Sequence, residues 1–182
     1  MTANSPGRRW AIVALGPDDV DRVSPLWAAM VAHHRALTAD AWPVRDTEDA
    51  WSRRRRQYVE WLETSAAAAQ PSAWLLAAVP AGEPGGVPLG YAMLVVGPSG
   101  PTWDLGELTG ELESLSVAED ARGCGVGGAL IAAARATLRE RGVLHWYVGV
   151  VGANAGAIAL YEREGFRPFF VTMLSTVEDA TG

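Results

Sequence analysis

The residues of this chain that are best suited to chemistry form a glycine-rich run after a strand-like segment. Gly123, Gly125, Gly127 and Gly128 stand between an alternating segment that ends near Val117 and an apolar segment with helical spacing. Glycines let a backbone turn sharply and approach a ligand closely, and the first N–H groups of a helix have no partner within that helix. The run therefore predicts a backbone cradle for an anion such as a pyrophosphate.

Several kinds of nucleotide-binding loop contain such glycines. Gly123, Gly125 and Gly128 satisfy the spacing G-x-G-x-x-G of dinucleotide-binding folds, but the next apolar run, 144–151, ends without the acidic residue that would bind the ribose. A P-loop needs a lysine after its last glycine, and all 15 basic residues of this chain are arginine. A dinucleotide-binding oxidoreductase is therefore the weakest alternative.

Two sequence motifs that follow one another along the chain are more specific than the glycine spacing alone. Arg122-Gly-Cys-Gly-Val-Gly127 fits the pattern R/Q-x-x-G-x-G/A, and Asn154-Ala-Gly-Ala-Ile-Ala-Leu-Tyr-Glu-Arg-Glu-Gly-Phe166 fits N-x-x-A-x-x-L-Y-x-x-x-G-F. In this order, and with a helix after the first motif, they resemble the GCN5-related N-acetyltransferase (GNAT) superfamily. The resemblance is strongest over residues 108–170.

The resemblance implies acetyl-CoA as co-substrate and no metal. The pyrophosphate would lie on the glycine loop, and the pantetheine arm would pair with the preceding strand as if it were an added strand. Tyr161 would protonate the departing thiolate, and Asn154 would bind the cofactor or a water near the sulfur. The implied CoA contacts are Leu115, Ser116, Val117, Arg122, Gly123, Cys124, Gly125, Val126, Gly127, Gly128, Asn154 and Tyr161.

The general base is less well defined, and Glu111 and Glu113 are its local candidates. They lie two positions apart on a predicted strand and would share a face unless a bulge intervenes. Some relatives carry a base on the following strand, but the comparable stretch 148–150 has no acidic side chain here. Asp104, Glu107 or a water chain stay open as alternatives.

These acidic residues favour a cationic small-molecule amine as acceptor, such as an aminoglycoside, a polyamine or an amino acid. The resemblance also places four tryptophans in segments that wall the acceptor pocket, namely Trp27, Trp42, Trp51 and Trp103. Their rings could make cation–π contacts with an ammonium group of the substrate. A peptide N-terminus or a protein lysine is an alternative acceptor. A second functional class is a sensor that binds acyl-CoA without catalysing a reaction. The presence of Tyr161 argues against this alternative.

Composition narrows the functional classes. The 182 residues carry a formal net charge of −6, which opposes general nucleic-acid binding, and no apolar run reaches the ~18 residues of a membrane-spanning helix. We therefore expect neither a nucleic-acid nor a membrane partner. The single cysteine, Cys124, forbids an internal disulfide, which agrees with a cytoplasmic location.

Three further groups have ordinary structural explanations. Arg53-Arg-Arg-Arg56 would spread around a helix and form a solvated face. His33 and His34 would point about 100° apart on a helix and could not share one metal ion. Phe169–Leu174 could finish the sheet or form the interface of a homodimer, an expectation that comes from the family.

Periodicity and turn residues predict a single α+β domain over residues 9–177, between flexible ends at 1–8 and 178–182. By resemblance, its core is a mostly antiparallel sheet of six to seven strands with helices on both faces. The predicted strands are 7–15, 73–79, 89–96, 111–117, 144–151 and 169–174, and the predicted helices are 17–37, 46–63, 126–141 and 155–164.

Overall fold

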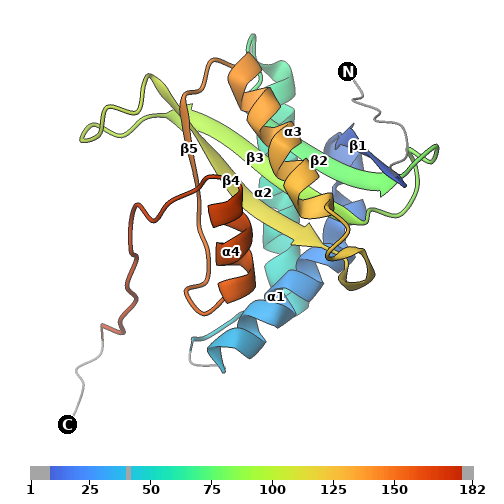
Figure 1. Ribbon diagram of the computed structural model, residues 1–182, viewed down its shortest axis with the longest axis horizontal. Helices are drawn as coiled ribbons and strands as arrows, with labels where there is room; N and C mark the ends of the chain where they lie inside the picture. Colours follow the sequence, from blue (N-terminus) through green and yellow to red (C-terminus); the bar gives the residue numbers. More distant parts are fainter. Residues whose placement is uncertain (1–8, 40–41, 178–182) are drawn as a thin grey trace.

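The computed structural model describes residues 9–39 and 42–177, which build one five-stranded sheet in the order β1-β2-β3-β4-β5 (Figure 1). From β1 to β4 each strand is antiparallel to the next, and β5 runs parallel to β4. The mixed α+β class is confirmed. The ends predicted to be flexible, 1–8 and 178–182, lie outside the described residues.

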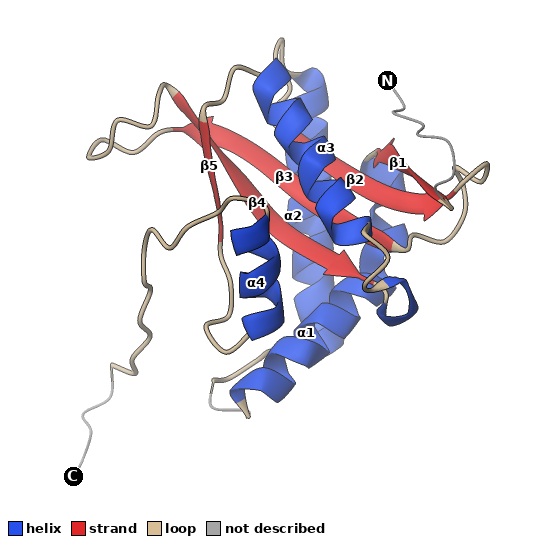
Figure 2. Cartoon of the chain, in the orientation of Figure 1, coloured by secondary structure: helices blue, strands red, loops and turns tan. Residues whose placement is uncertain are grey.

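Strands and helices follow one another along the chain largely as the sequence pattern predicts (Figure 2). The strands are β1 (Trp10–Leu15), β2 (Ala73–Pro80), β3 (Gly90–Pro98), β4 (Leu108–Val117) and β5 (His145–Val148). The α-helices are α1 (Ser24–Thr38), α2 (Thr47–Ala67), α3 (Val126–Glu140) and α4 (Ala155–Arg163), and the 3₁₀ turns are η1 (Pro17–Val23) and η2 (Glu119–Ala121).

Local chemistry explains where the first two helices begin. The carboxylate of Asp46 accepts hydrogen bonds from two N–H groups of the first turn of α2 and so caps it. The helix predicted from Pro17 is divided into η1 and α1. Because Pro25 has no N–H to donate to the preceding turn, the α-helix begins only at Ser24.

The two faces of the sheet bury different helices, as expected. On one face, α3 and α4 pack against a core that includes Leu76, Leu94 and Leu112. On the other face, η1, α1 and α2 pack against a core that includes Leu75 and Met93. Adjacent residues of one strand therefore enter opposite cores. Figure 1 shows α3 in front of the sheet and α2 behind it.

The expected six to seven strands are not found; the described residues hold five. Phe169–Leu174, predicted as the last strand, pairs with no strand there, and β5 is an edge strand. The rings of Phe169 and Phe170 pack edge-on against Trp103 instead, at centroid separations of 5.5 and 6.2 Å. Alternating apolar residues fit a strand, but pairing also requires a partner edge within reach, which a local pattern does not specify.

Candidate functional site

A gap between β4 and β5 is the central feature of the site. The two strands pair only over 109–112 and 145–148 and then separate. Within the part of the chain that the structure describes, the segment 113–117 of β4 has no strand beside it on this side, although its other edge still pairs with β3. Such an edge can take an extended ligand as an added strand.

A β-bulge in β4 sets the direction of its side chains. Met93 of β3 pairs with Ser114 and the next residue, Leu94, pairs with Leu112, so Glu113 is the extra residue of β4. The alternation of faces is reversed beyond this point. The bulge that sequence analysis left as an alternative is therefore present.

Beyond the bulge, the three predicted pantetheine contacts all line the gap. Leu115 and Val117 pack against the core on the α3 side of the sheet. Ser116 faces the other side, where its hydroxyl donates to the carbonyl of Leu26 in α1 at 2.9 Å. The gap is thus bounded by α1 on one side and by α3 on the other.

Two glycines give the loop before α3 its shape. Gly123 and Gly125 have φ angles of 74° and 83°, in the left-handed region that glycine adopts without strain. The first hydrogen bond of α3 runs from the N–H of Ala129 to the carbonyl of Gly125. The preceding N–H groups, starting at Val126, have no partner within the helix and lie at the positive end of its dipole, which suits an anion.

The other two glycines of the run also have a packing role. A β-carbon at Gly127 would lie 3.3 Å from Cδ2 of Leu160, and one at Gly128 would lie 3.0 Å from Oε1 of Glu164. Leu160 belongs to α4, and Glu164 follows its last residue. These glycines therefore let α3 and α4 approach closely, a contact that the sequence did not reveal.

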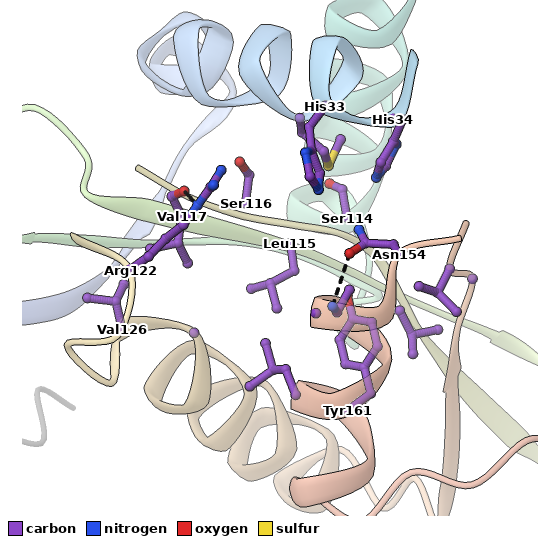
Figure 3. A pocket seen from close by; sticks show the side chains of 18 of the residues that line it. His33, His34, Ser114, Leu115, Ser116, Val117, Arg122, Val126, Asn154 and Tyr161 are labelled. Carbon is purple, nitrogen blue, oxygen red and sulfur yellow. Dashed lines mark hydrogen bonds between the residues drawn. The ribbon is translucent and has the colours of Figure 1, made fainter. Parts of the chain in front are cut away.

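The gap, the glycine loop and α1 enclose a cavity of about 910 Å³, the cofactor cavity (Figure 3). In Figure 3, Arg122 and Val126 lie at one end and Asn154 and Tyr161 at the other. Of the implied CoA contacts, all except the exposed Cys124 line it, namely Leu115, Ser116, Val117, Arg122, Gly123, Gly125, Val126, Gly127, Gly128, Asn154 and Tyr161.

Helix α4 and its N-cap supply two polar residues, Tyr161 and Asn154, at the end of the cofactor cavity that lies away from the glycine loop. The Oδ1 atom of Asn154 accepts a hydrogen bond of 3.1 Å from the N–H of Ala157 and so caps α4. Tyr161 is 8% exposed, and burial raises its pKa to about 12. Its hydroxyl therefore keeps its proton at neutral pH and can act as a hydrogen-bond donor.

Glu113 lies in the cofactor cavity with both carboxylate oxygens engaged. Arg54 of α2 donates to Oε1, and the hydroxyl of Tyr58 donates to Oε2 at 3.0 Å. The Tyr58 hydroxyl also hydrogen bonds with Ser114, so the bulge is tied to α2. Burial, and next the neighbouring Tyr91 and Glu113, raise the pKa of Tyr58 well above its usual value.

A second cavity, of about 1650 Å³, adjoins the first. Residues 148–150 and Tyr161 line both cavities. The walls of the second cavity include the carboxylates of Glu60 and Glu111 and the aromatic rings of Trp61, Trp103 and Tyr147. Carboxylates beside aromatic faces form a suitable environment for an ammonium group.

Glu111 lines this second cavity rather than the first. Its Oε2 atom accepts a hydrogen bond of 3.1 Å from the hydroxyl of Tyr147 on the adjacent strand. Burial and the Glu111 carboxylate raise the pKa of Tyr147. The two glutamates that sequence analysis paired therefore enter different cavities. Asp104 and Glu107 line neither of them.

The four tryptophans expected around an acceptor are dispersed. Trp27 is buried and lines the cofactor cavity, and the ring of Trp51 packs against it at 5.3 Å. Trp103 lines the second cavity. Trp42 is 43% exposed and lines neither cavity.

Sequence reasoning missed Arg54 because the four consecutive arginines suggested a solvated face. Arg53 and Arg55 do form exposed ion pairs, with Asp49 and Asp21, whereas Arg54 reaches Glu113. The available signal was the helical spacing of Arg54 and the buried Tyr58, which places both on one side of α2.

Neither a metal site nor a membrane span emerges from the described ranges, 9–39 and 42–177. No group of three or more His, Cys, Asp or Glu residues there could hold a metal ion. None of the helices described is long and apolar enough to cross a membrane.

Comparison with other sequences agrees with this geometry. A model of the acetyltransferase (GNAT) family matches residues 36–166. A segment of 78 residues is 38% identical to the mycothiol acetyltransferase of Saccharomonospora viridis, and covers 43% of this chain and 26% of that protein. A segment of 63 residues is 48% identical to the mycothiol acetyltransferase of Beutenbergia cavernae, and covers 35% of this chain and 21% of that protein. The chain thus spans about a quarter of the length of these curated relatives.

Solved structures share the fold at low sequence identity. A GCN5-related N-acetyltransferase from Ralstonia eutropha JMP134 has a TM-score of 0.66 at 23% identity, covering 93% of this chain and 99% of that chain. AAC(6')-Iy, in complex with a CoA bisubstrate analog, has a TM-score of 0.65 at 16% identity, covering 94% and 99%. An aminoglycoside acetyltransferase from an uncultured soil metagenomic sample, in complex with sisomicin, has a TM-score of 0.61 at 15% identity, covering 93% and 97%.

Proposed function

Because this chain belongs to the acetyltransferase (GNAT) family, we propose that it is an acetyl-CoA-dependent N-acetyltransferase whose acceptor is the primary amine of a cationic small molecule. One observation supports this proposal above others: the cofactor cavity and the second cavity meet at Tyr161. A thioester in the first and an amine in the second would therefore come together beside a hydroxyl that can donate a proton.

The cofactor residues act mainly by position. We assign the pyrophosphate to the N–H groups around Gly125 and the start of α3, and the pantetheine arm to the free edge of β4 at 115–117. Asn154 faces the thioester end of the same cavity. Holding the amine against the thioester carbonyl removes much of the entropic barrier to attack, so little further chemistry is needed.

The acidic residues receive different roles in this proposal. Glu111, in the second cavity, attracts the acceptor ammonium together with the aromatic rings of Trp61 and Trp103. Glu113, bound by Arg54 and Tyr58, holds the bulge of β4 in place. Tyr161 gives its proton to the sulfur as the C–S bond breaks.

The first test is release of thiol from acetyl-CoA in the presence of aminoglycosides, polyamines, amino acids or short peptides, with Tyr161→Phe measured alongside. We expect release to depend on one class of cationic small molecule and to fall about 100-fold or more in the variant, with the dissociation constant for CoA unchanged. Release that requires a peptide would move the acceptor class to peptide N-termini or lysines. CoA binding without release by any amine would favour a non-catalytic sensor.

A further inference from the structure

Helix α1 brings two adjacent histidines to the cofactor cavity. His33 and His34 both line it, and Figure 3 shows their side chains extending from α1 toward Ser114 and Asn154. This is the side of the cavity on which Tyr161 also lies, away from Arg122 at the other end. The two imidazoles therefore lie at the same end of the cofactor cavity as Tyr161, the residue at which this cavity meets the second one.

The carboxylates are poorly placed to compete for a proton there. Among the described residues that line the cofactor cavity, Glu113 is the sole carboxylate, and both of its oxygens accept hydrogen bonds from α2. Glu111 lines the other cavity and accepts a hydrogen bond from Tyr147. On the cofactor-cavity side of the acceptor amine, a base therefore has to come from another side chain or from water.

His34 has the properties that this role requires. No hydrogen bond to its ring occurs within residues 9–39 and 42–177, so a ring nitrogen is available to a ligand. Burial, and next the neighbouring His33, lower its pKa below 6.5, which keeps the imidazole neutral at pH 7. The other titratable or charged groups that line the cavity are His33 from α1, Arg54 from α2, Glu113 from β4, Arg122 from the loop, and Tyr161 and Arg163 from α4.

We propose that His34 is a catalytic residue that accepts the proton lost by the acceptor ammonium, an inference that rests on the proposed transfer reaction. Acetyl-CoA and R–NH₃⁺ give the acetamide, CoA thiol and one proton. The neutral imidazole takes this proton and passes it to water. The nitrogen then bonds to the carbonyl carbon as the C–S bond breaks, the sulfur receives a proton from Tyr161, and the Tyr161 oxygen recovers the second proton of the nitrogen.

The experiment compares His34→Gln with His33→Gln, a matched control on the same helix and in the same cavity. We expect kcat/KM of His34→Gln at pH 7 to fall about 100-fold, and this loss to shrink as pH rises toward the pKa of the acceptor amine, where the amine itself is neutral. In the wild type, kcat/KM should fall at a pH below 6.5 as His34 becomes protonated, and this fall should be absent in His34→Gln. His33→Gln should keep the wild-type kcat/KM at pH 7 and still lose activity at low pH, with that loss shifted toward higher pH because the neighbouring His33 lowers the pKa of His34. Both variants should bind CoA as the wild type does.

The outcomes separate this inference from the proposed function. A wild-type protein that turns over an amine, with His34→Gln showing the same pH profile, would overturn the role of His34 alone. Equal losses in His33→Gln and His34→Gln would also overturn it, because they would indicate a common effect on the structure of α1. A wild-type protein that binds CoA but acetylates no amine would refute the function, and the role of His34 with it.

Discussion

The carboxylate of Glu113 is held by two side chains of α2 while only 14% of its side chain is exposed. Its guanidinium partner, Arg54, is 31% exposed and also lies over the Tyr58 ring at 5.6 Å. A carboxylate in such surroundings needs both its counter-charge and its hydrogen bonds, because water reaches it poorly. At the scale of single residues, this pair fixes the position of α2 relative to the β4 bulge.

Replacing Arg54 by Leu should therefore destabilise the fold. We expect the free energy of unfolding to fall by about 1 to 2 kcal/mol. The loss should be smaller than for a fully buried ion pair, because solvent still screens Arg54. In a Glu113→Gln background the same replacement should cost less, since no charge is left unpaired. Urea unfolding of the four proteins gives the coupling free energy, and equal costs in both backgrounds would contradict a specific pair.

At the scale of elements, the site depends on how one strand and one helix end. β4 continues past its pairing with β5, and α3 starts directly after a left-handed Gly125. The free strand edge and the free N–H groups are thus neighbours in one cavity. A ligand that is extended at one end and anionic at the other matches this arrangement.

Replacing Gly125 by Ala separates backbone strain from ligand binding. An alanine that has to adopt the φ of 83° found at Gly125 should lower the free energy of unfolding by about 1 kcal/mol. Because the loop would also shift from its ligand geometry, we expect CoA binding to weaken about tenfold or more, as for the loss of one charge-assisted hydrogen bond.

The matched control is Gly142→Ala. Gly142 has a similar φ of 76°, its β-carbon would also meet nothing within 4 Å, and it lines neither cavity. This variant should lose a similar amount of stability and keep its affinity for CoA, as measured by calorimetry. Equal weakening of CoA binding in both variants would argue against the glycine loop as the phosphate site.

At the scale of the whole molecule, one sheet is shared by two cores. Leu130 of α3 is fully buried in the core on one face, and Leu62 of α2 is 6% exposed in the core on the other. Adjacent residues of β2 and β3 contribute to opposite cores, so neither core can be lost without disturbing the sheet that supports the other. The molecule should therefore unfold as one cooperative unit.

Leu130→Ala tests this cooperativity. We expect the free energy of unfolding to fall by about 2 to 5 kcal/mol, because the variant no longer buries the leucine side chain and a cavity is left in its place. Far-UV circular dichroism and tryptophan fluorescence should report the same urea midpoint. Leu144→Ala, at a position 77% exposed, is the control and should change stability by less than about 0.5 kcal/mol. Two separate transitions would show that the two cores unfold independently.

The sequence by itself determined the order of the elements, the glycine loop before α3 and the cap of α4. These features depend on periodicity, on the conformational freedom of Gly123 and Gly125, and on a side chain that binds its own helix at Asn154. Each signal lies within a short stretch of chain, so it can be read without knowing what packs against it.

Only the tertiary structure decided the rest of the site. The Arg54–Glu113 pair, the separation of Glu111 from Glu113, and the packing of Gly128 against the end of α4 all join residues that are distant in sequence. The missing last strand belongs here too, because a strand needs a partner edge as well as an apolar pattern. Such contacts depend on the register of β4 and on the placement of α2, which the whole core fixes together.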